Sequence, residues 1–200
     1  MKKKLKTESW YDGKLYDILF SPLLVDLRKK IAGLIPAGRV LEIGCGTGEL
    51  AGYINTNTEY YGIDLSGKMI ERARTKKNNH NVTFILGNVF EYHVEKKFDY
   101  VVFSLLLHSI DNILAEKLLV WAKENSEHII IADYKIPQPD ISAGKIIIKV
   151  IEVLAGRDHY QCFKKYKINN GISFFAEKSS MKKLAEENYG MFQIVKLGPG

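Results

Sequence analysis

Short runs of apolar residues alternate with amphipathic segments along most of this chain, and this alternation restricts the fold more than any other feature. Each run is long enough for a strand, and most are followed by a segment whose apolar residues recur at helical spacing. Strands that are apolar throughout are buried on both faces, which is typical of a parallel sheet covered by helices. We therefore expect an α/β fold, a doubly wound, mostly parallel Rossmann-like sheet with helices on both faces. The expected strands cover 39–44, 59–65, 82–86, 98–107, 128–134 and 192–197.

The segments between these runs predict the helices. A first helix is expected over 23–35, where leucine and isoleucine recur at helical spacing. Ser66 and Asp111 each precede an amphipathic segment and are expected to cap it, because their side chains can accept hydrogen bonds from free N–H groups. Other helices are expected to begin near Gly48, to cover 141–154, and to run from Ser179 or Ser180 to Glu187.

Length and composition fit one ordinary soluble domain. The chain has 200 residues, 46% hydrophobic and 26% charged, and no internal repeat or linker. Cys45 and Cys162 are far apart in the sequence, which fits a reducing compartment. No apolar run reaches the ~18–20 residues that a membrane-spanning helix needs. We expect a cytoplasmic protein with no membrane span.

The segment VLEIGCGTG, from Val40 to Gly48, places glycines at alternate positions between a strand and a helix. Glycine there allows a tight turn and the close approach of a ligand to the backbone. The spacing G-x-G-x-G differs from the G-x-G-x-x-G of dinucleotide-binding proteins, which disfavours a nicotinamide-dependent oxidoreductase. Asp64 ends the second expected strand, where a carboxylate can accept two hydrogen bonds from a ribose diol.

These motifs together resemble the class I S-adenosylmethionine-dependent methyltransferases, in the small-molecule branch typified by the ubiquinone/menaquinone-biosynthesis methyltransferases. The resemblance runs from Val40 to Tyr134 and rests on VLEIGCGTG, GIDLSGKMIERAR, LGNVF and FDYVVFSLLLHSI. It implies S-adenosyl-L-methionine as the cofactor and S-adenosyl-L-homocysteine as its product. The expected reaction is direct displacement of the methyl group by a small-molecule acceptor, in which alignment of the two reactants supplies most of the catalysis.

The resemblance also implies roles for individual residues. The glycine loop would hold the methionine part of the cofactor, and Asp64 its ribose. Asn88 stands where the family usually has an aspartate that contacts the adenine amino group. The residues expected to bind the cofactor are Glu42, Gly44, Cys45, Gly46, Asp64, Leu65, Met69, Asn88, Val89 and Ser104.

Residues on the acceptor side are expected in three places. His108 follows the fourth expected strand and is either a general base or substrate contact, or a structural histidine bonded to the backbone. Tyr11 and Tyr16 lie in a segment that resembles the family's N-terminal lid. His159 and Tyr160 lie in GRDHY, which resembles the family's substrate-side insertion.

The expected organisation is a single methyltransferase domain over 1–200. It comprises an N-terminal lid and helix (1–36), a cofactor-binding core (39–134) and a substrate-side insertion (135–178). Sheets of this family end in an antiparallel pair of strands, whereas only one such strand is visible here. Either the seventh strand is missing, which gives a six-stranded sheet, or another segment supplies it; the hypothesis taken forward is the six-stranded sheet. Its open edge, or the apolar 141–154 helix, would be the contact of a homodimer.

Two alternative functions stay open. The net charge of +6 favours an RNA or protein methyltransferase, although the basic residues are scattered and nucleic acid is not the expected partner. The second alternative is a catalytically inactive protein that binds the cofactor and interacts with partners. No histidine pair stands at metal-ligand spacing with cysteine, aspartate or glutamate, so no metal site is expected.

Overall fold

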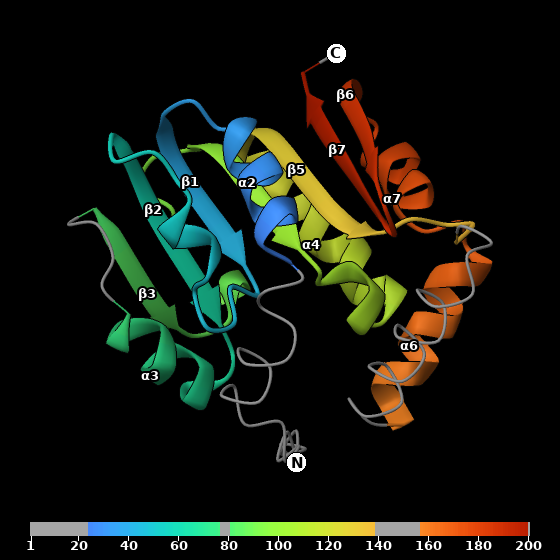
Figure 1. Ribbon diagram of the computed structural model, residues 1–200, viewed down its shortest axis with the longest axis horizontal. Helices are drawn as coiled ribbons and strands as arrows, with labels where there is room; N and C mark the ends of the chain where they lie inside the picture. The colour runs from blue at the N-terminus through green and yellow to red at the C-terminus, as the bar shows by residue number, and fades with distance from the viewer. Residues whose placement is uncertain (1–23, 77–80, 139–156, 200) are drawn as a thin grey trace.

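A computed structural model describes residues 24–76, 81–138 and 157–199. Their strands form one seven-stranded sheet in the order β3-β2-β1-β4-β5-β7-β6 (Figure 1). Strands β1 to β5 run parallel to one another, and β7 is antiparallel to both β5 and β6. The predicted α/β fold with a mostly parallel sheet is confirmed. The strands are β1 (Gly38–Ile43), β2 (Thr58–Asp64), β3 (Val82–Leu86), β4 (Phe98–Ser104), β5 (Ser126–Tyr134), β6 (Lys182–Tyr189) and β7 (Phe192–Gly198).

Helices of both the α and 3-10 kinds connect and cover these strands. Ser66 caps α3, with its Oγ 3.4 Å from the N–H of Met69, and Asp111 caps α4 by accepting from the N–H of Ile113 at 3.0 Å. Both predicted caps are confirmed. The helices are α2 (Val25–Gly33), α3 (Gly67–Thr75), α4 (Asn112–Asn125), α6 (Arg157–Ile168) and α7 (Ile172–Ser179), with 3-10 turns η2 (Leu50–Gly52), η3 (Val89–Glu91) and η4 (Leu107–Ser109).

The predicted six-stranded sheet is wrong, because residues 182–189 form the edge strand β6 instead of the end of a helix. Ser179 ends α7, and Ser180 has a left-handed backbone (φ 53°), so neither caps a following helix. All side chains of β6 before Tyr189 are exposed. An edge strand with both faces in solvent lacks the alternation of apolar and polar residues by which strands are recognised. Its lysines and glutamates also disfavour pairing with another chain.

Other expectations differ or fall outside the described ranges. The helix expected near Gly48 is only the short turn η2. The 141–154 helix, together with Tyr11 and Tyr16, lies outside the described residues, so dimerisation through that helix stays a prediction. Within 24–76, 81–138 and 157–199, no helix is long and apolar enough to cross a membrane.

The register of the parallel strands brings their carboxyl ends to one edge of the sheet. Ile43 at the end of β1 pairs with Ile63 of β2 and with Phe103 of β4. Asp64 at the end of β2 pairs with Leu86 at the end of β3. The loops that follow these strands therefore meet at the edge where Rossmann-like folds bind ligands.

Candidate functional site

The loop after β1 contains Gly44, Gly46 and Gly48, each with a left-handed backbone (φ 72°, 53° and 72°). Only glycine adopts this conformation at little cost. A Cβ atom on Gly48 would lie 2.4 Å from Cζ of Phe84, and one on Gly44 would lie 2.8 Å from Cδ1 of Leu106. At Gly46, by contrast, no atom of the described residues lies within 4 Å of such a Cβ, the adjacent residues of the loop aside. The loop thus leaves open space beside the backbone of Gly46, where a ligand can approach.

Asp64 joins the end of β2 to this glycine loop. Its Oδ2 accepts a hydrogen bond from the N–H of Gly46 at 2.9 Å, and its Oδ1 accepts from the N–H of Ser66 at 2.8 Å. A carboxylate has about four acceptor positions, so each oxygen can accept one bond more. Asp64 therefore stabilises the loop and still has acceptors for the hydroxyl groups of a ligand.

A cleft of about 150 Å³ opens at the carboxyl ends of β1, β2 and β3. Leu65, at its wall, is 69% exposed, and Phe90 is also exposed. Exposed apolar side chains around a concave site are typical of ligand pockets. The cleft brings together five of the ten residues expected to bind the cofactor, namely Gly44, Asp64, Leu65, Asn88 and Val89.

One wall of the cleft was not anticipated from the sequence. It comes from the loop after β4 and from α4, and contains Leu106, Ile110, Leu114 and Leu118. Leu105 has a left-handed backbone (φ 53°), uncommon for leucine, and its N–H donates to the carbonyl of Ala132 at 2.8 Å. The helical spacing of Leu114 and Leu118 indicated a buried face, but nothing in the sequence showed that this face borders the cleft.

Glu42, near the end of β1, and Cys45, within the glycine loop, do not line the cleft. Glu42 is 3% exposed and accepts a hydrogen bond from the hydroxyl of Tyr60. Burial raises the pKa of Glu42 to about 8, while Tyr60 and the nearby Arg28 act in the opposite direction. Burial also raises the pKa of the Cys45 thiol, which keeps it protonated and inert. Contact of either residue with a cofactor stays a prediction.

The other expected cofactor residues are placed around the cleft. Gly46, Met69 and Ser104 are absent from its lining. Met69 is half-buried in the first turn of α3, and Ser104 ends β4 beside Ala132. Asn88 lines the cleft, and its Oδ1 also accepts from the N–H of Phe90 at 3.2 Å, which caps η3. The roles of these residues stay predictions.

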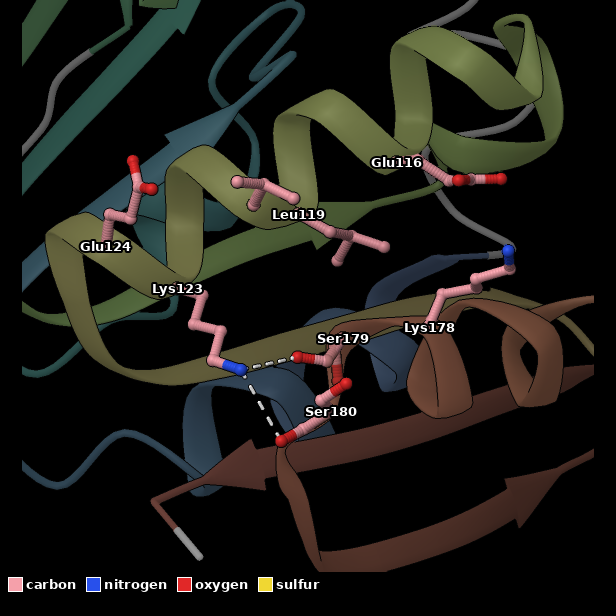
Figure 2. A pocket seen from close by; sticks show the side chains of 8 residues that line it. Glu116, Leu119, Lys123, Glu124, Lys178, Ser179 and Ser180 are labelled. Carbon is pink, nitrogen blue, oxygen red and sulfur yellow. Dashed lines mark hydrogen bonds between the residues drawn. The ribbon is translucent and has the colours of Figure 1, made fainter.

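A larger groove, of about 550 Å³, lies between α4 and α7 (Figure 2). Its Lys123 ammonium donates to the carbonyl oxygens of Ser179 at 3.0 Å and Ser180 at 3.5 Å, so this cation stabilises the C-terminal end of α7. None of the expected site residues lines this groove. We therefore place the functional site at the smaller cleft. In the part of the chain that the structure describes, no group of three His, Cys, Asp or Glu side chains could hold a metal ion.

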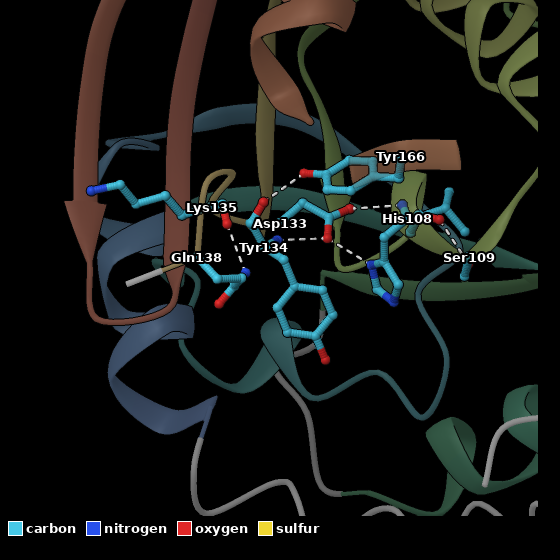
Figure 3. A network of polar contacts seen from close by, with 8 residues as sticks. His108, Ser109, Asp133, Tyr134, Lys135, Gln138 and Tyr166 are labelled. Atoms are coloured by element: carbon cyan, nitrogen blue, oxygen red, sulfur yellow. Dashed lines mark hydrogen bonds and ion pairs between the residues drawn. The ribbon is translucent and has the colours of Figure 1, made fainter. Parts of the chain in front are cut away.

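His108 lies in η4, directly after β4, and is bonded to the end of β5 (Figure 3). Its Nδ1 lies 2.6 Å from Oδ1 of Asp133, and its backbone N–H donates to Oδ2 of Asp133 at 3.1 Å. Asp133 is fully buried and also accepts from the N–H of Tyr134 at 2.7 Å. In the tautomer whose Nδ1–H donates to this carboxylate, the lone pair of the imidazole is on Nε2. This arrangement allows His108 to take up a proton at Nε2.

Asp133 was missed by the sequence reasoning. It stands near the end of the fifth apolar run, HIIIADY, just as Asp64 stands at the end of the second. An acidic residue in an otherwise apolar strand is the sequence feature that could have identified Asp133 as a candidate functional residue. Its partner, however, is 25 residues away in the sequence.

Aromatic rings from β5 and α6 surround His108. The centroid of its ring lies 4.7 Å from that of Tyr134 and 5.4 Å from that of His159, with Phe163 and Tyr166 at 6.2 Å and 6.3 Å. Helix α6 thus brings His159, an expected acceptor-side residue, against His108. Tyr160, on the same helix, is half-buried, with the Lys164 ammonium 4.7 Å from its ring centroid.

The cleft and the histidine cluster share the loop after β4. Leu106 and Ile110, which flank η4, line the cleft, while His108 between them faces Asp133. A ligand in the cleft would therefore lie beside the loop that holds the histidine.

Comparison with known proteins relates the chain to methyltransferases. Residues 40–124 match the family model described as methyltransferase domain. A Geobacillus protein (strain WCH70), named only provisionally as a methyltransferase, is 32% identical over 117 residues, which cover 54% of this chain and 44% of that protein. The malonyl-[acyl-carrier protein] O-methyltransferase of Priestia megaterium is 35% identical over 66 residues, covering 32% of this chain and 24% of the relative. The match thus spans less than half the length of these curated relatives.

Among solved structures, magnesium protoporphyrin IX methyltransferase of Synechocystis PCC 6803, with bound S-adenosylhomocysteine, superposes with a TM-score of 0.60. It is 19% identical, and the alignment covers 94% of this chain and 83% of that one. At this identity the likeness establishes the fold alone. Residues 40–124 thus match a methyltransferase domain in sequence, and the chain shares the fold of solved methyltransferases.

Proposed function

We propose that this protein transfers a methyl group from S-adenosylmethionine to a hydroxyl oxygen of a small-molecule acceptor. One observation carries the proposal: the loop after β4 borders the glycine cleft through Leu106 and Ile110 and holds His108 bonded to Asp133 between them. A cofactor cleft and a group able to accept a proton are thus held by one short segment.

The residues of the cleft fit this cofactor. Asp64 has a free acceptor position on each carboxylate oxygen for a ribose diol. The backbone at Gly46 is open to close approach, and Leu65 and Val89 offer an apolar surface to adenine. When bound, S-adenosylmethionine supplies a methyl group on a positively charged sulfur that a nucleophile can displace.

The residues on the acceptor side favour a hydroxyl group as the methyl acceptor. A neutral hydroxyl is a weak nucleophile, and a base that removes its proton during attack accelerates the reaction. In the proposal, Nε2 of His108 takes this proton, and Asp133 orients the ring and stabilises its charged form. A carboxylate acceptor, such as that of a malonyl thioester, is already ionised at neutral pH and needs no base. The His108–Asp133 pair therefore favours a hydroxyl acceptor over the carboxylate one that the relatives' name suggests.

Calorimetric titration tests the cofactor. We expect micromolar binding of S-adenosylmethionine and S-adenosylhomocysteine and no binding of NAD. Absence of binding by all three compounds would contradict the proposal.

If the cofactor binds, turnover is measured with phenols and alcohols in parallel with carboxylates and RNA. Methylation of RNA alone, with affinity that falls steeply with salt, would favour the RNA methyltransferase. Binding without turnover of any acceptor would favour the inactive cofactor-binding protein.

Asp64→Ala is expected to weaken the binding of S-adenosylhomocysteine by about 1.5–3 kcal/mol, the range for a hydrogen bond to a charged group. The variant loses the acceptors for the ribose and the bond that fixes the N–H of Gly46. Titration calorimetry measures the change, with Glu71→Ala as the control, because Glu71 is an exposed acid on the adjacent helix α3. Equal affinities of Asp64→Ala and wild type would place the ribose elsewhere.

A further inference from the structure

The residues that flank α3, Asp64 before it and Lys76 at its C-cap, both bond to the glycine loop. At the start of the helix, Asp64 accepts from the N–H of Gly46 and from the N–H of Ser66, the residue that caps the helix. At its end, the ammonium of Lys76 donates to the carbonyl oxygen of Thr47 at 2.7 Å and forms an ion pair with Glu49. Lys76 and Thr47 are 29 residues apart in the sequence.

These side-chain bonds act where the loop has few backbone bonds of its own. The N–H groups of Gly44 and Cys45 donate to the carbonyl of Ile63, and that of Gly48 donates to the carbonyl of Cys45. The N–H of Gly46 and the carbonyl of Thr47 bond instead to the side chains of Asp64 and Lys76. Glycine loses more conformational entropy than other residues when it is ordered, so this loop needs such external bonds to hold one conformation.

Packing at the middle of α3 adds a third contact. A Cβ atom on Gly48 would lie 3.0 Å from the Cβ of Ala73, so the helix and the loop touch directly. Thr47 is 4% exposed. The Lys76 and Glu49 side chains are each 24% exposed. Charged groups that are partly shielded from water interact more strongly than a fully exposed pair.

We infer that Lys76 is a positioning residue that holds the glycine loop in its ligand-binding conformation through the carbonyl group of Thr47. Lys76 does not touch the ligand in this assignment. Its ammonium fixes one peptide group of the loop while Asp64 fixes another, so the open backbone at Gly46 lies between two anchored points. The inference rests on the proposed function, since the ligand of the loop is S-adenosylmethionine.

Lys76→Met tests this role in the full-length chain, with Lys68→Met as the matched control. Lys68 is an exposed lysine of the same helix, and methionine preserves most of the side-chain length. We expect the Kd of S-adenosylhomocysteine to rise about tenfold in Lys76→Met, to stay within twofold of wild type in Lys68→Met, and to recover in Lys76→Arg. Once a methyl acceptor has been identified, the KM of Lys76→Met for S-adenosylmethionine should rise while its kcat changes less than twofold.

Hydrogen exchange of the free protein gives a readout that does not depend on the ligand. The amides of residues 44–48 should exchange faster in Lys76→Met than in wild type, whereas those of β4 and β5 should not change. If wild type binds S-adenosylhomocysteine and Lys76→Met binds it equally well, the inference is overturned. An equal loss of affinity in Glu49→Gln, which keeps the bond to Thr47, also overturns it. If wild type binds neither cofactor form, the proposed function fails, and unchanged exchange at 44–48 would overturn the loop anchor separately.

Discussion

Replacing His108 with alanine is expected to lower kcat by about 10²–10⁴-fold, the usual contribution of a general base, and to leave the Kd of S-adenosylmethionine within threefold. The physical reason is that Nε2 would no longer take the proton of the acceptor hydroxyl, whereas His108 is not among the residues that line the cleft. Steady-state kinetics with the hydroxyl acceptor found by screening, together with calorimetry, measure the two effects separately.

Two further variants sharpen this test. Asp133→Asn replaces an acceptor by a group that can also donate, so the ring loses the partner that fixes Nδ1–H, and kcat should fall in the same range. His93→Ala serves as the control, because His93 is exposed and distant in the sequence from the cluster. An undiminished kcat of His108→Ala would show that the histidine is structural.

Glu42→Gln is expected to remove a large pH dependence of stability. Burial raises the pKa of Glu42 from 4.5 to about 8, so the folded protein retains a proton that the unfolded chain releases. This contribution is fully present below about pH 4.5 and is lost as pH rises through 8. The difference of 3.5 pKa units (8 − 4.5) corresponds to at most about 5 kcal/mol. Glutamine cannot ionise, and its Oε1 can still accept from the hydroxyl of Tyr60.

The measurement is urea unfolding at pH 6, 7 and 8.5. The stability of Glu42→Gln relative to wild type should rise by about 2.5 kcal/mol between pH 6 and pH 8.5, because the folded wild-type protein loses the Glu42 proton over this range. The charges near this carboxyl are included in the expectation: Arg28 lowers its pKa and Asp64 raises it. Glu71→Gln, an exposed position, should leave the pH dependence unchanged. Parallel curves for wild type and Glu42→Gln would mean that Glu42 is ionised in the folded protein across this range.

The sequence alone determined the parts of this protein that depend on local patterns. Residues 82–86 form the third strand as predicted, because VTFIL is a short run rich in the β-branched and aromatic residues that favour strands. Ser66 and Asp111 cap helices because each side chain reaches an N–H group two or three residues ahead. The glycine loop was also predicted from its local pattern, because the close approach of a ligand to the backbone requires glycine. Asp64 was predicted because it stands at the end of a strand, where a carboxylate can reach a ligand.

Only the tertiary structure decided which distant residues meet. Strand β6 is stabilised by pairing with β7. Its side chains are exposed, so their pattern does not predict a strand. The bonds of His108 to Asp133 and of Lys76 to Thr47 depend on the register of parallel strands and on how a helix packs across a loop. The burial of Glu42, which the sequence could not show, raises the pKa of its carboxyl, and Glu42 does not line the cleft. Local propensity acts over a few residues, whereas these contacts form only when the whole sheet is assembled.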